Sequence, residues 1–209
     1  MNTTANKISK SDAVKDILFT DIFNLEEIQE LQDLFSDASG VAALMISPDG
    51  TPITNPSNFC RLCNDIIRKT VKGYSNCYRS GTMIGRYNPS EIIFWPCLSG
   101  GLWDAGTSIS INGKHIANWL IGQVRSEGYS ELQMLLYADE IGADRVEFMK
   151  AMNEIPVMSF EKFNHLAKQL FGLTKKLAEQ GYKNFLLEKQ IEESDKIIKL
   201  LLEKEKLHS

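Results

Sequence analysis

The chain has 209 residues, enough for one domain of ordinary size with an extended appendage. Its formal net charge of -4 argues against general nucleic-acid binding, which requires a basic face. No apolar run approaches the roughly 18 to 20 residues that a membrane span needs, and the first residues lack the charged-then-apolar layout of a signal peptide. We therefore expect a cytoplasmic protein with reduced thiols, no membrane partner and no direct nucleic-acid partner.

The N-terminal part is predicted to hold a lead-in, a helix and a hairpin. Residues 1–18 are polar and are expected to form a flexible lead-in. Asn24 is the expected N-cap of a helix that ends near Gly40, because apolar residues recur after it at helical spacing. Residues 41–47 and 51–54 have β-like patterns on either side of a Pro-Asp-Gly turn signal, which predicts a β-hairpin.

The middle of the chain is predicted to insert helices before three further strands. Residues 57–73 follow a helical pattern, and a second short helix is expected to carry Cys77. An Asn-Gly pair, which is typical of a tight two-residue turn, joins the last two of three β-like runs. These runs are 91–96, 102–111 and 115–124. The prediction is an α+β fold with a PAS-like antiparallel five-stranded sheet and inserted helices, because this order of elements matches the PAS fold type.

The C-terminal third of the sequence is helical. Two short helices are predicted at 130–138 and 144–152, and a long helix follows with Ser159 as its N-cap. The apolar positions of the long helix alternate steps of three and four residues, the spacing of a coiled-coil seam. We expect a sensory domain at 19–158 and a homodimer through a coiled coil at 159–209. The alternative is a single helix that lies on the domain.

The stretch Trp95–Asp104, Trp-Pro-Cys-Leu-Ser-Gly-Gly-Leu-Trp-Asp, combines two tryptophans, a cysteine, a Gly-Gly pair and an acid. Aromatic walls with few polar groups suit a small organic ligand. We interpret this stretch as a pocket wall with Asp104 as the orienting polar group. The alternative is that the tryptophans are core and that Asp104 caps a strand or turn. The predicted ligand-binding residues are Cys97, Trp103, Asp104, Trp95, Trp119, Arg68 and Gln123.

Four cysteines allow a metal site. Cys60 and Cys63 form a C-x2-C pair, a spacing that lets two sulfurs share one metal ion. With Cys77 and Cys97 they would make a four-sulfur site for a structural zinc ion or an iron-containing centre. The alternative is that some or all of the thiols are buried small residues.

The sequence contains no catalytic motif that we recognise. The three histidines do not combine into a catalytic set, and no zinc-protease, hydrolase, phosphate-loop or dinucleotide motif occurs. The acids are scattered on predicted helix faces, where solvated charge explains them. We therefore expect no enzymatic activity within this chain.

A family resemblance rests on three groups of these residues. Over roughly residues 19–180 the sequence resembles the PocR sensory domain, a PAS variant of prokaryotic transcription regulators and sensor kinases. The matching positions are Cys63, Ile67, Arg68, Gly73, Cys77, Ser80, the segment Cys97–Asp104, Ile116 and the run Gly122-Gln123-Val124. An extra glycine in the segment and Trp103 depart from the family pattern. The resemblance implies ligand or metal roles for Cys63, Cys77, Cys97 and Asp104, and also for Arg68 and Gln123.

The resemblance also implies a function, which is the sensing of simple hydrocarbon derivatives such as small diols. The bound state would be relayed through the C-terminal coiled coil to an output domain. The sequence from Leu200 onward is similar to the lead-in of a histidine-kinase dimerisation helix, so a downstream kinase is the expected partner. The alternative functions are a cysteine-based metal or redox sensor and a pure dimerisation module.

Overall fold

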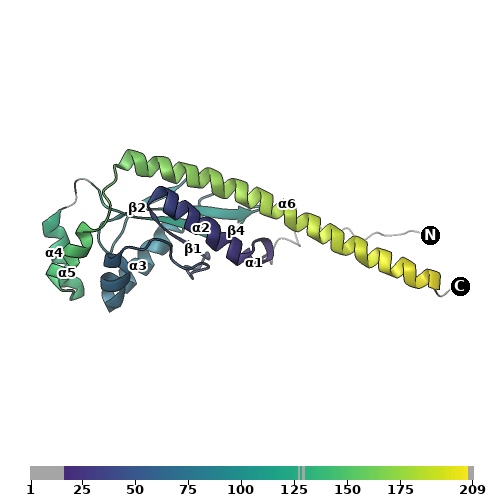
Figure 1. Cartoon of the computed structure of the whole chain (residues 1–209), viewed down its shortest axis with the longest axis horizontal. Helices are drawn as coiled ribbons and strands as arrows, with labels where there is room; N and C mark the ends of the chain where they lie inside the picture. The colour runs from purple at the N-terminus through teal and green to yellow at the C-terminus, as the bar shows by residue number, and fades with distance from the viewer. Residues whose placement is uncertain (1–16, 127, 129, 207–209) are drawn as a thin grey trace.

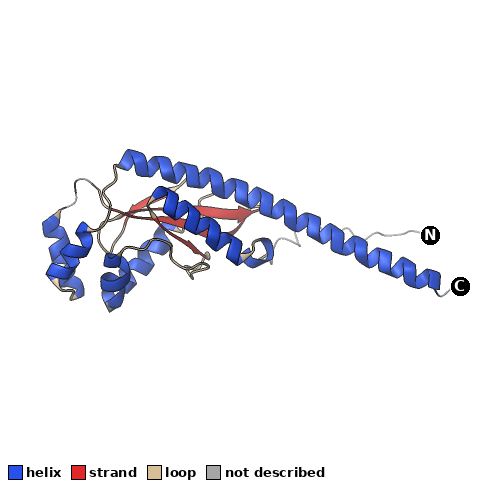
Figure 2. Ribbon diagram, viewed as in Figure 1, coloured by secondary structure: helices blue, strands red, loops and turns tan. Residues whose placement is uncertain are grey.

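A single antiparallel sheet lies between helices in the computed structural model, which describes residues 17–126, 128 and 130–206. One long helix extends far beyond the sheet (Figures 1 and 2). Most of the predicted lead-in, residues 1–16, lies outside the described residues. The strands follow the order β1-β4-β3-β2, and they are β1 (Ala42–Ile46), β2 (Ile93–Pro96), β3 (Trp103–Ile111) and β4 (Lys114–Val124).

Helices cover both faces of the sheet (Figure 1). One face packs against α1 (Phe19–Ile22), α2 (Leu25–Ser39) and α6 (Phe160–Lys206). The other face lies under α3 (Val71–Ile84), which is preceded by a π-helix (Leu62–Ile66) and a 3-10 helix (Ile67–Lys69). The remaining helices are α4 (Glu131–Ile141) and α5 (Arg145–Asn153). Within the described residues, none of these helices combines the length and apolar character that crossing a bilayer requires.

Local sequence signals explain where several elements begin and end. The side chain of Asn24 accepts hydrogen bonds from the backbone N–H groups of Glu26 and Glu27 at 2.8 and 3.3 Å, which confirms it as the N-cap of α2. At the tip of the β3–β4 hairpin, Asn112 and Gly113 have φ angles of 49° and 83°. Both are positive, as the predicted tight turn requires.

The prediction of five strands is wrong, because the sheet has four in the described residues. Residues 51–54 run beside β1 but form only an isolated bridge between Pro52 and Ile46. A proline has no N–H to donate to a ladder. Further along, the hydroxyl oxygen of Thr54 accepts the backbone N–H of Met45 at 2.9 Å, so a side chain takes the place of a backbone partner. In place of the predicted hairpin, residues 51–54 form an irregular segment along the edge of the sheet, beside β1.

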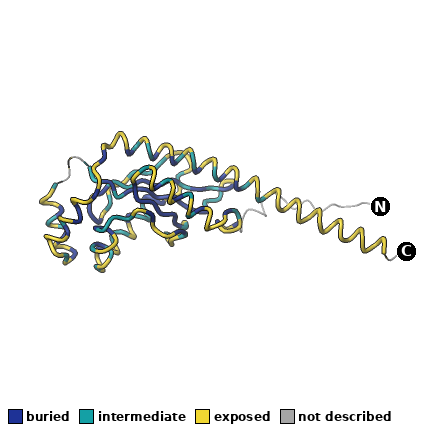
Figure 3. Tube along the Cα trace, in the orientation of Figure 1, coloured by how far each residue is buried: buried dark blue, intermediate teal, exposed yellow. Residues whose placement is uncertain are grey.

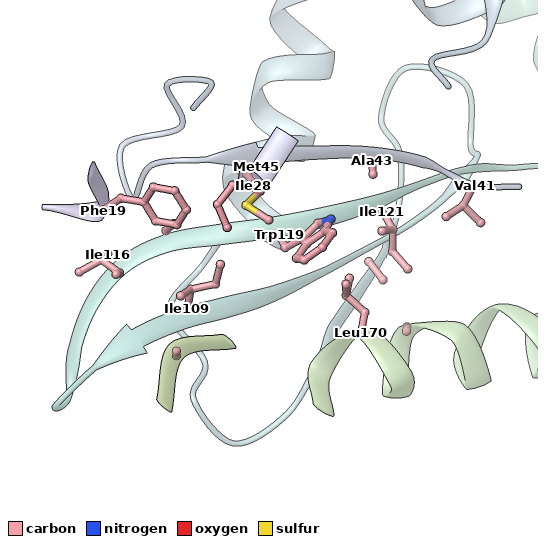
Figure 4. Packing of buried hydrophobic residues seen from close by; sticks show 14 of the residues in the cluster. Phe19, Ile28, Val41, Ala43, Met45, Ile109, Ile116, Trp119, Ile121 and Leu170 are labelled. Carbon is pink, nitrogen blue, oxygen red and sulfur yellow. The ribbon is translucent and has the colours of Figure 1, made fainter. Parts of the chain in front are cut away.

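The main hydrophobic core fills the space between the sheet and α6. It contains Met45 from β1, Ile109 from β3 and Trp119 from β4, all completely buried (Figure 4). Phe163 of α6 is completely buried in the same core. Phe35 of α2 packs its ring against Trp119 with 5.7 Å between centroids. The first half of α6 is therefore part of the domain core.

The second half of α6 leaves the domain at Gly181. A Cβ at this position would lie 2.5 Å from a ring carbon of Phe23, so glycine permits the close approach of the two segments. From Tyr182 to Lys206 no residue of α6 is buried (Figure 3). The exposed part includes large apolar side chains, namely Leu186, Leu187, Ile191, Ile197, Ile198, Leu200, Leu201 and Leu202. The long helix is thus half core element and half uncovered amphipathic rod.

Candidate functional site

A cavity of about 310 Å³ lies between α3 and the sheet face that α6 does not cover. Its deep part is formed by buried residues, among them Cys63, Leu102 and Gly122. Its rim is formed by half-exposed residues, among them Tyr74 and Tyr78. The hydroxyl of Tyr78 donates to the carbonyl of Asp49 at 2.9 Å and so ties α3 to the turn after β1. The volume falls at the lower end of the range seen for small-molecule sites, roughly 300 Å³ and above.

The loop between β2 and β3 places the cysteine of the predicted pocket segment at this cavity. The backbone N–H of Cys97 donates to the carbonyl of Leu102 at 2.7 Å, and the N–H of Gly101 donates back to the carbonyl of Cys97 at 2.8 Å. Gly101 has a φ of 63°, a left-handed conformation that glycine adopts without strain. The hydroxyl of Ser80 in α3 accepts from the N–H of Leu98 at 2.9 Å and fixes the loop against the helix.

A β-bulge in β4 shapes the other side of the deep part. Trp103 pairs with Val124 and Ala105 pairs with Ile121, so Gly122 and Gln123 together face Asp104. A Cβ on Gly122 would lie 1.9 Å from a carboxylate oxygen of Asp104, so only glycine leaves room for this carboxylate.

The second bulge residue, Gln123, connects three segments at the cavity. It has a φ of 58°, which is uncommon for a residue other than glycine. Its backbone N–H donates to Asp104 Oδ1 at 3.0 Å, and its side-chain oxygen accepts the backbone N–H of Cys60 at 2.7 Å. Strained backbone that the surroundings hold in place is common at functional sites.

Asp104 is a carboxylate without a cationic partner among the described residues. Burial raises its pKa from 3.8 to about 6, and the Gln123 N–H and the Cys97 thiol partly oppose this by hydrogen bonding to the carboxylate. No lysine, arginine or histidine within the described residues forms an ion pair with it. A charge buried without a partner is costly, so this carboxylate is a strong candidate for contact with a ligand.

The four thiols gather around the same carboxylate. Cys63, Cys77 and Cys97 line the cavity, and Cys63 hydrogen-bonds with Cys60. Burial raises the pKa of Cys97 and Cys77 well into the range where the thiols stay neutral. The hydrogen bond with Cys60 and burial together raise the pKa of Cys63, whereas the hydrogen bond from Cys63 lowers the pKa of Cys60.

The four thiols are not grouped as a set of metal ligands in the part of the chain that the structure describes. Among the residues that the structure describes, no three histidine, cysteine, aspartate or glutamate side chains are grouped so that they could hold a metal ion. In place of a shared ion, Cys63 and Cys60 contact each other, and Cys97 contacts Ser80 and Asp104. The zinc or iron centre predicted on these residues stays a prediction.

Arg68 supplies the positive charge of the cavity lining. Its guanidinium carbon lies 5.4 Å from the ring centroid of Phe59 and 5.9 Å from that of Tyr74. These cation–π contacts hold the side chain at the cavity. Arg68 forms no ion pair with any described residue. Arg68, Cys97, Asp104 and Gln123, all predicted from the sequence as ligand contacts, therefore meet at one cavity.

The three tryptophans that were predicted as ligand contacts do not line this cavity. Trp119 is completely buried on the opposite face of the sheet, close to Met45, Ile121 and Leu170 (Figure 4). Trp103 also faces α6, with its ring centroid 5.1 Å from that of Phe160. Trp95 is 39% exposed at the end of β2. If one of the tryptophans contacts a ligand, that contact lies outside this cavity.

One face of α3 forms a cavity wall, of which sequence reasoning predicted Cys77 and missed Tyr74, Tyr78 and Gly81. Tyr74, Cys77, Tyr78 and Gly81 recur at steps of three, one and three residues, which places them on the same side of the helix. The sequence signal was the combination of two tyrosines and a glycine on that face.

Comparison with known proteins agrees with the resemblance. Residues 21–182 match the family described as the sensory domain found in PocR. The matched range covers most of the chain and includes every residue that lines the cavity. No curated protein and no solved structure shows a significant match.

Proposed function

The chain belongs to the PocR sensory-domain family, and on that premise we propose that the cavity beneath α3 binds a small organic molecule and that α6 relays the bound state to an output domain. The observation that carries this proposal is Asp104, a carboxylate without a partner cation in a mostly apolar cavity. Such a cavity with a few convergent polar groups is the usual form of a small-molecule site. A sensory family fits binding rather than catalysis as the role of this chain.

The position of β3 supports the proposed relay. Asp104 faces the cavity, whereas Thr107 faces α6 and lies 3.3 Å from Thr174, oxygen to oxygen. One strand therefore touches both the cavity and the helix. A ligand can shift the arrangement of α6 only if it binds one arrangement better than the other.

Filling the cavity is expected to abolish binding without unfolding the protein. A Cβ on Gly81 would have Leu120 Cδ1 as its nearest neighbour, at 3.9 Å, so this position has free space towards the cavity. Gly81→Leu should therefore occupy the ligand volume, while the loss of a helical glycine favours folding by about 0.5 to 1 kcal/mol. Thermal-shift screening with short alcohols, aldehydes, acids and methylated amines checks this.

The matched control is Gly81→Ala, which adds one methyl group and should keep both the fold and the response to ligand. The proposal expects at least one compound to stabilise the wild type and Gly81→Ala, and none to stabilise Gly81→Leu. If Gly81→Leu responds as the wild type does, the ligand binds elsewhere. If no compound stabilises the wild type, a small organic ligand of these classes is excluded.

We further propose that the exposed half of α6 pairs with the same helix of a second copy. Leu187, Ile191, Ser194, Ile198 and Leu201 follow one another at alternating steps of four and three residues, which is the spacing of a self-complementary coiled-coil seam. All five are exposed in the single chain. An output domain such as a histidine kinase would follow this coil.

Removing the exposed seam is expected to convert a dimer into a monomer. A chain that ends at Lys183 keeps Gly181 and all buried positions of α6, so the domain should keep its melting temperature and its ligand response. Light scattering during size-exclusion chromatography measures the mass of both forms. The double variant Ile191→Lys with Ile198→Lys, in the full chain, tests the same seam without truncation. A full-length chain that stays monomeric at high concentration would contradict the proposed coil.

A cysteine-based metal or redox sensor is the second candidate function, because three of the thiols line the cavity and the fourth, Cys60, hydrogen-bonds with Cys63. Elemental analysis of anaerobically purified protein separates the possibilities. Stoichiometric zinc would support a structural clamp, iron would support redox sensing, and the absence of both would leave the thiols as part of the cavity wall.

A further inference from the structure

We infer that the ligand is a short zwitterion, with a cationic nitrogen that faces Asp104 and a carboxylate that faces Arg68. This inference rests on the proposed function and narrows it to one chemical class. The cavity lining carries one negative and one positive side chain, and neither has an ion-pair partner among the described residues. A molecule with both charges complements the lining, whereas a neutral or singly charged molecule leaves at least one of them without a partner.

The Asp104 end requires a donor, preferably a charged one. Oδ1 of Asp104 already accepts the Gln123 N–H at 3.0 Å, and the Cys97 thiol donates to the same carboxylate. Both donors are uncharged, and no cation among the described residues compensates the negative charge. An ammonium group compensates a buried charge better than a hydroxyl group does, because it brings the opposite charge as well as N–H donors.

The Arg68 end requires an acceptor. The guanidinium carbon lies 5.4 Å from the ring centroid of Phe59 and 5.9 Å from that of Tyr74, and the side chain hydrogen-bonds with the Cys77 thiol. A guanidinium carries five N–H donors, and its planar fork matches the two oxygens of a carboxylate. An anionic group therefore has a prepared partner at this point of the lining.

Arg68 and Asp104 are separate charges in a cavity lining that is mostly apolar. They form no ion pair with each other, although the charges of both act on the Cys77 thiol. Ile67 and Leu120 contribute aliphatic surface to the same cavity. With a volume of about 310 Å³, the site suits a short aliphatic chain that separates the two charged groups.

A series of three-carbon compounds tests this inference on the full chain at pH 7.5. β-Alanine carries both charges, propylamine only the cation, propanoate only the anion, and 1,3-propanediol neither. Isothermal titration calorimetry is expected to give an affinity for an amino carboxylate at least 10-fold above that for each of the other three compounds. Glycine, 4-aminobutanoate and 5-aminopentanoate extend the series and locate the best separation of the charges.

Two variants assign the ends of the ligand. Arg68→Gln should remove the advantage of the amino carboxylate over propylamine, and Asp104→Asn should remove its advantage over propanoate. Arg79→Gln, an exposed arginine on α3 outside the cavity, is the matched control and should change no affinity. The specific pattern of loss distinguishes charge recognition from a general loss of structure.

The outcomes separate this inference from the function on which it rests. If the diol or the singly charged compounds bind as tightly as every amino carboxylate, the zwitterion inference is overturned and the small-molecule function stands. The zwitterion inference is also overturned, and the small-molecule function stands, if two results are found together. These are that no amino carboxylate binds, and that Gly81→Leu abolishes the binding of another compound from the thermal-shift screen. If nothing in either set binds the wild type, both are overturned.

Discussion

Asp104→Asn is expected to make the protein more stable at neutral pH and to weaken its response to the ligand. Burial raises the pKa of Asp104 from 3.8 to about 6, so the folded state disfavours the charged form. At pH 7.5 the ionised Asp104 carboxylate therefore lowers the free energy of unfolding by about 2 to 3 kcal/mol. Asparagine keeps an oxygen that can accept the Gln123 N–H at 3.0 Å and removes the charge. Chemical denaturation at several pH values measures the difference.

The sign of the pH dependence follows from the raised pKa. The destabilising contribution of Asp104 is complete above about pH 6, shrinks as the pH falls from 6 towards 3.8, and is absent below 3.8. The stability gain of Asp104→Asn should therefore be full at pH 7.5 and nearly absent at pH 4. The thiols of Cys63, Cys77 and Cys97, which share the cavity, stay neutral throughout this range because their pKa values are raised. A variant that is less stable than the wild type at pH 7.5 would show that the carboxylate is a structural hydrogen-bond partner rather than a ligand contact.

Trp119→Ala is expected to lower the free energy of unfolding by about 3 to 5 kcal/mol, the usual cost of removing a large buried aromatic side chain. The side chain is completely buried in the core between the sheet and α6, and its ring packs against Phe35. Because a domain is stable by only about 5 to 15 kcal/mol, this is a large fraction of the total. The affinity for ligand, measured at low temperature on the folded fraction, should change little.

Two controls show whether Trp119 acts through the core. Its indole N–H has no hydrogen-bond partner among the described residues, so Trp119→Phe removes no polar contact and should cost much less than alanine. Trp95→Ala, at a half-exposed position, should cost less than about 1.5 kcal/mol. If Trp119→Ala kept its stability and lost ligand binding, the residue would act as a ligand wall, as the sequence interpretation proposed.

The alternation of side chains along a strand explains why the tryptophan assignments and the structure differ. Trp103 and Asp104 are neighbours in β3, and neighbouring residues of a strand face opposite sides of the sheet. One pocket wall therefore accommodates Asp104 but not Trp103, and this rule was available from the sequence. Composition alone, two tryptophans near an acid, does not distinguish the two faces.

Structural features that depend on residues close together in the sequence were predicted well. Features that depend on contacts between distant segments were not. The cap at Asn24 and the turn at Asn112–Gly113 are local, and the structure confirms both. The absence of a strand at 51–54 depends on how Thr54 meets Met45, and the cavity depends on a bulge at Gln123 that only the pairing of β3 with β4 creates. No periodicity in the sequence reports such contacts.

The stability of this domain and its proposed function oppose each other at one residue. An unpaired carboxylate costs stability in the empty cavity, and a ligand that compensates its charge recovers that cost on binding. Gly122 permits this arrangement, because its lack of a side chain creates the space that the carboxylate occupies. The strongest stabilising substitutions in this chain are therefore expected at the site itself.

The most direct test of the central claim is a carbon-13 NMR titration of the Asp104 carboxyl group, with the free protein and with the compound that binds most tightly in the series above. We expect a pKa of about 6 in the free protein, and a clear decrease when the ligand places a donor or a positive charge beside the carboxylate. A pKa near the ordinary value of 3.8 in the free protein, unchanged by ligand, would contradict the claim that Asp104 is the unpaired carboxylate that recognises the ligand.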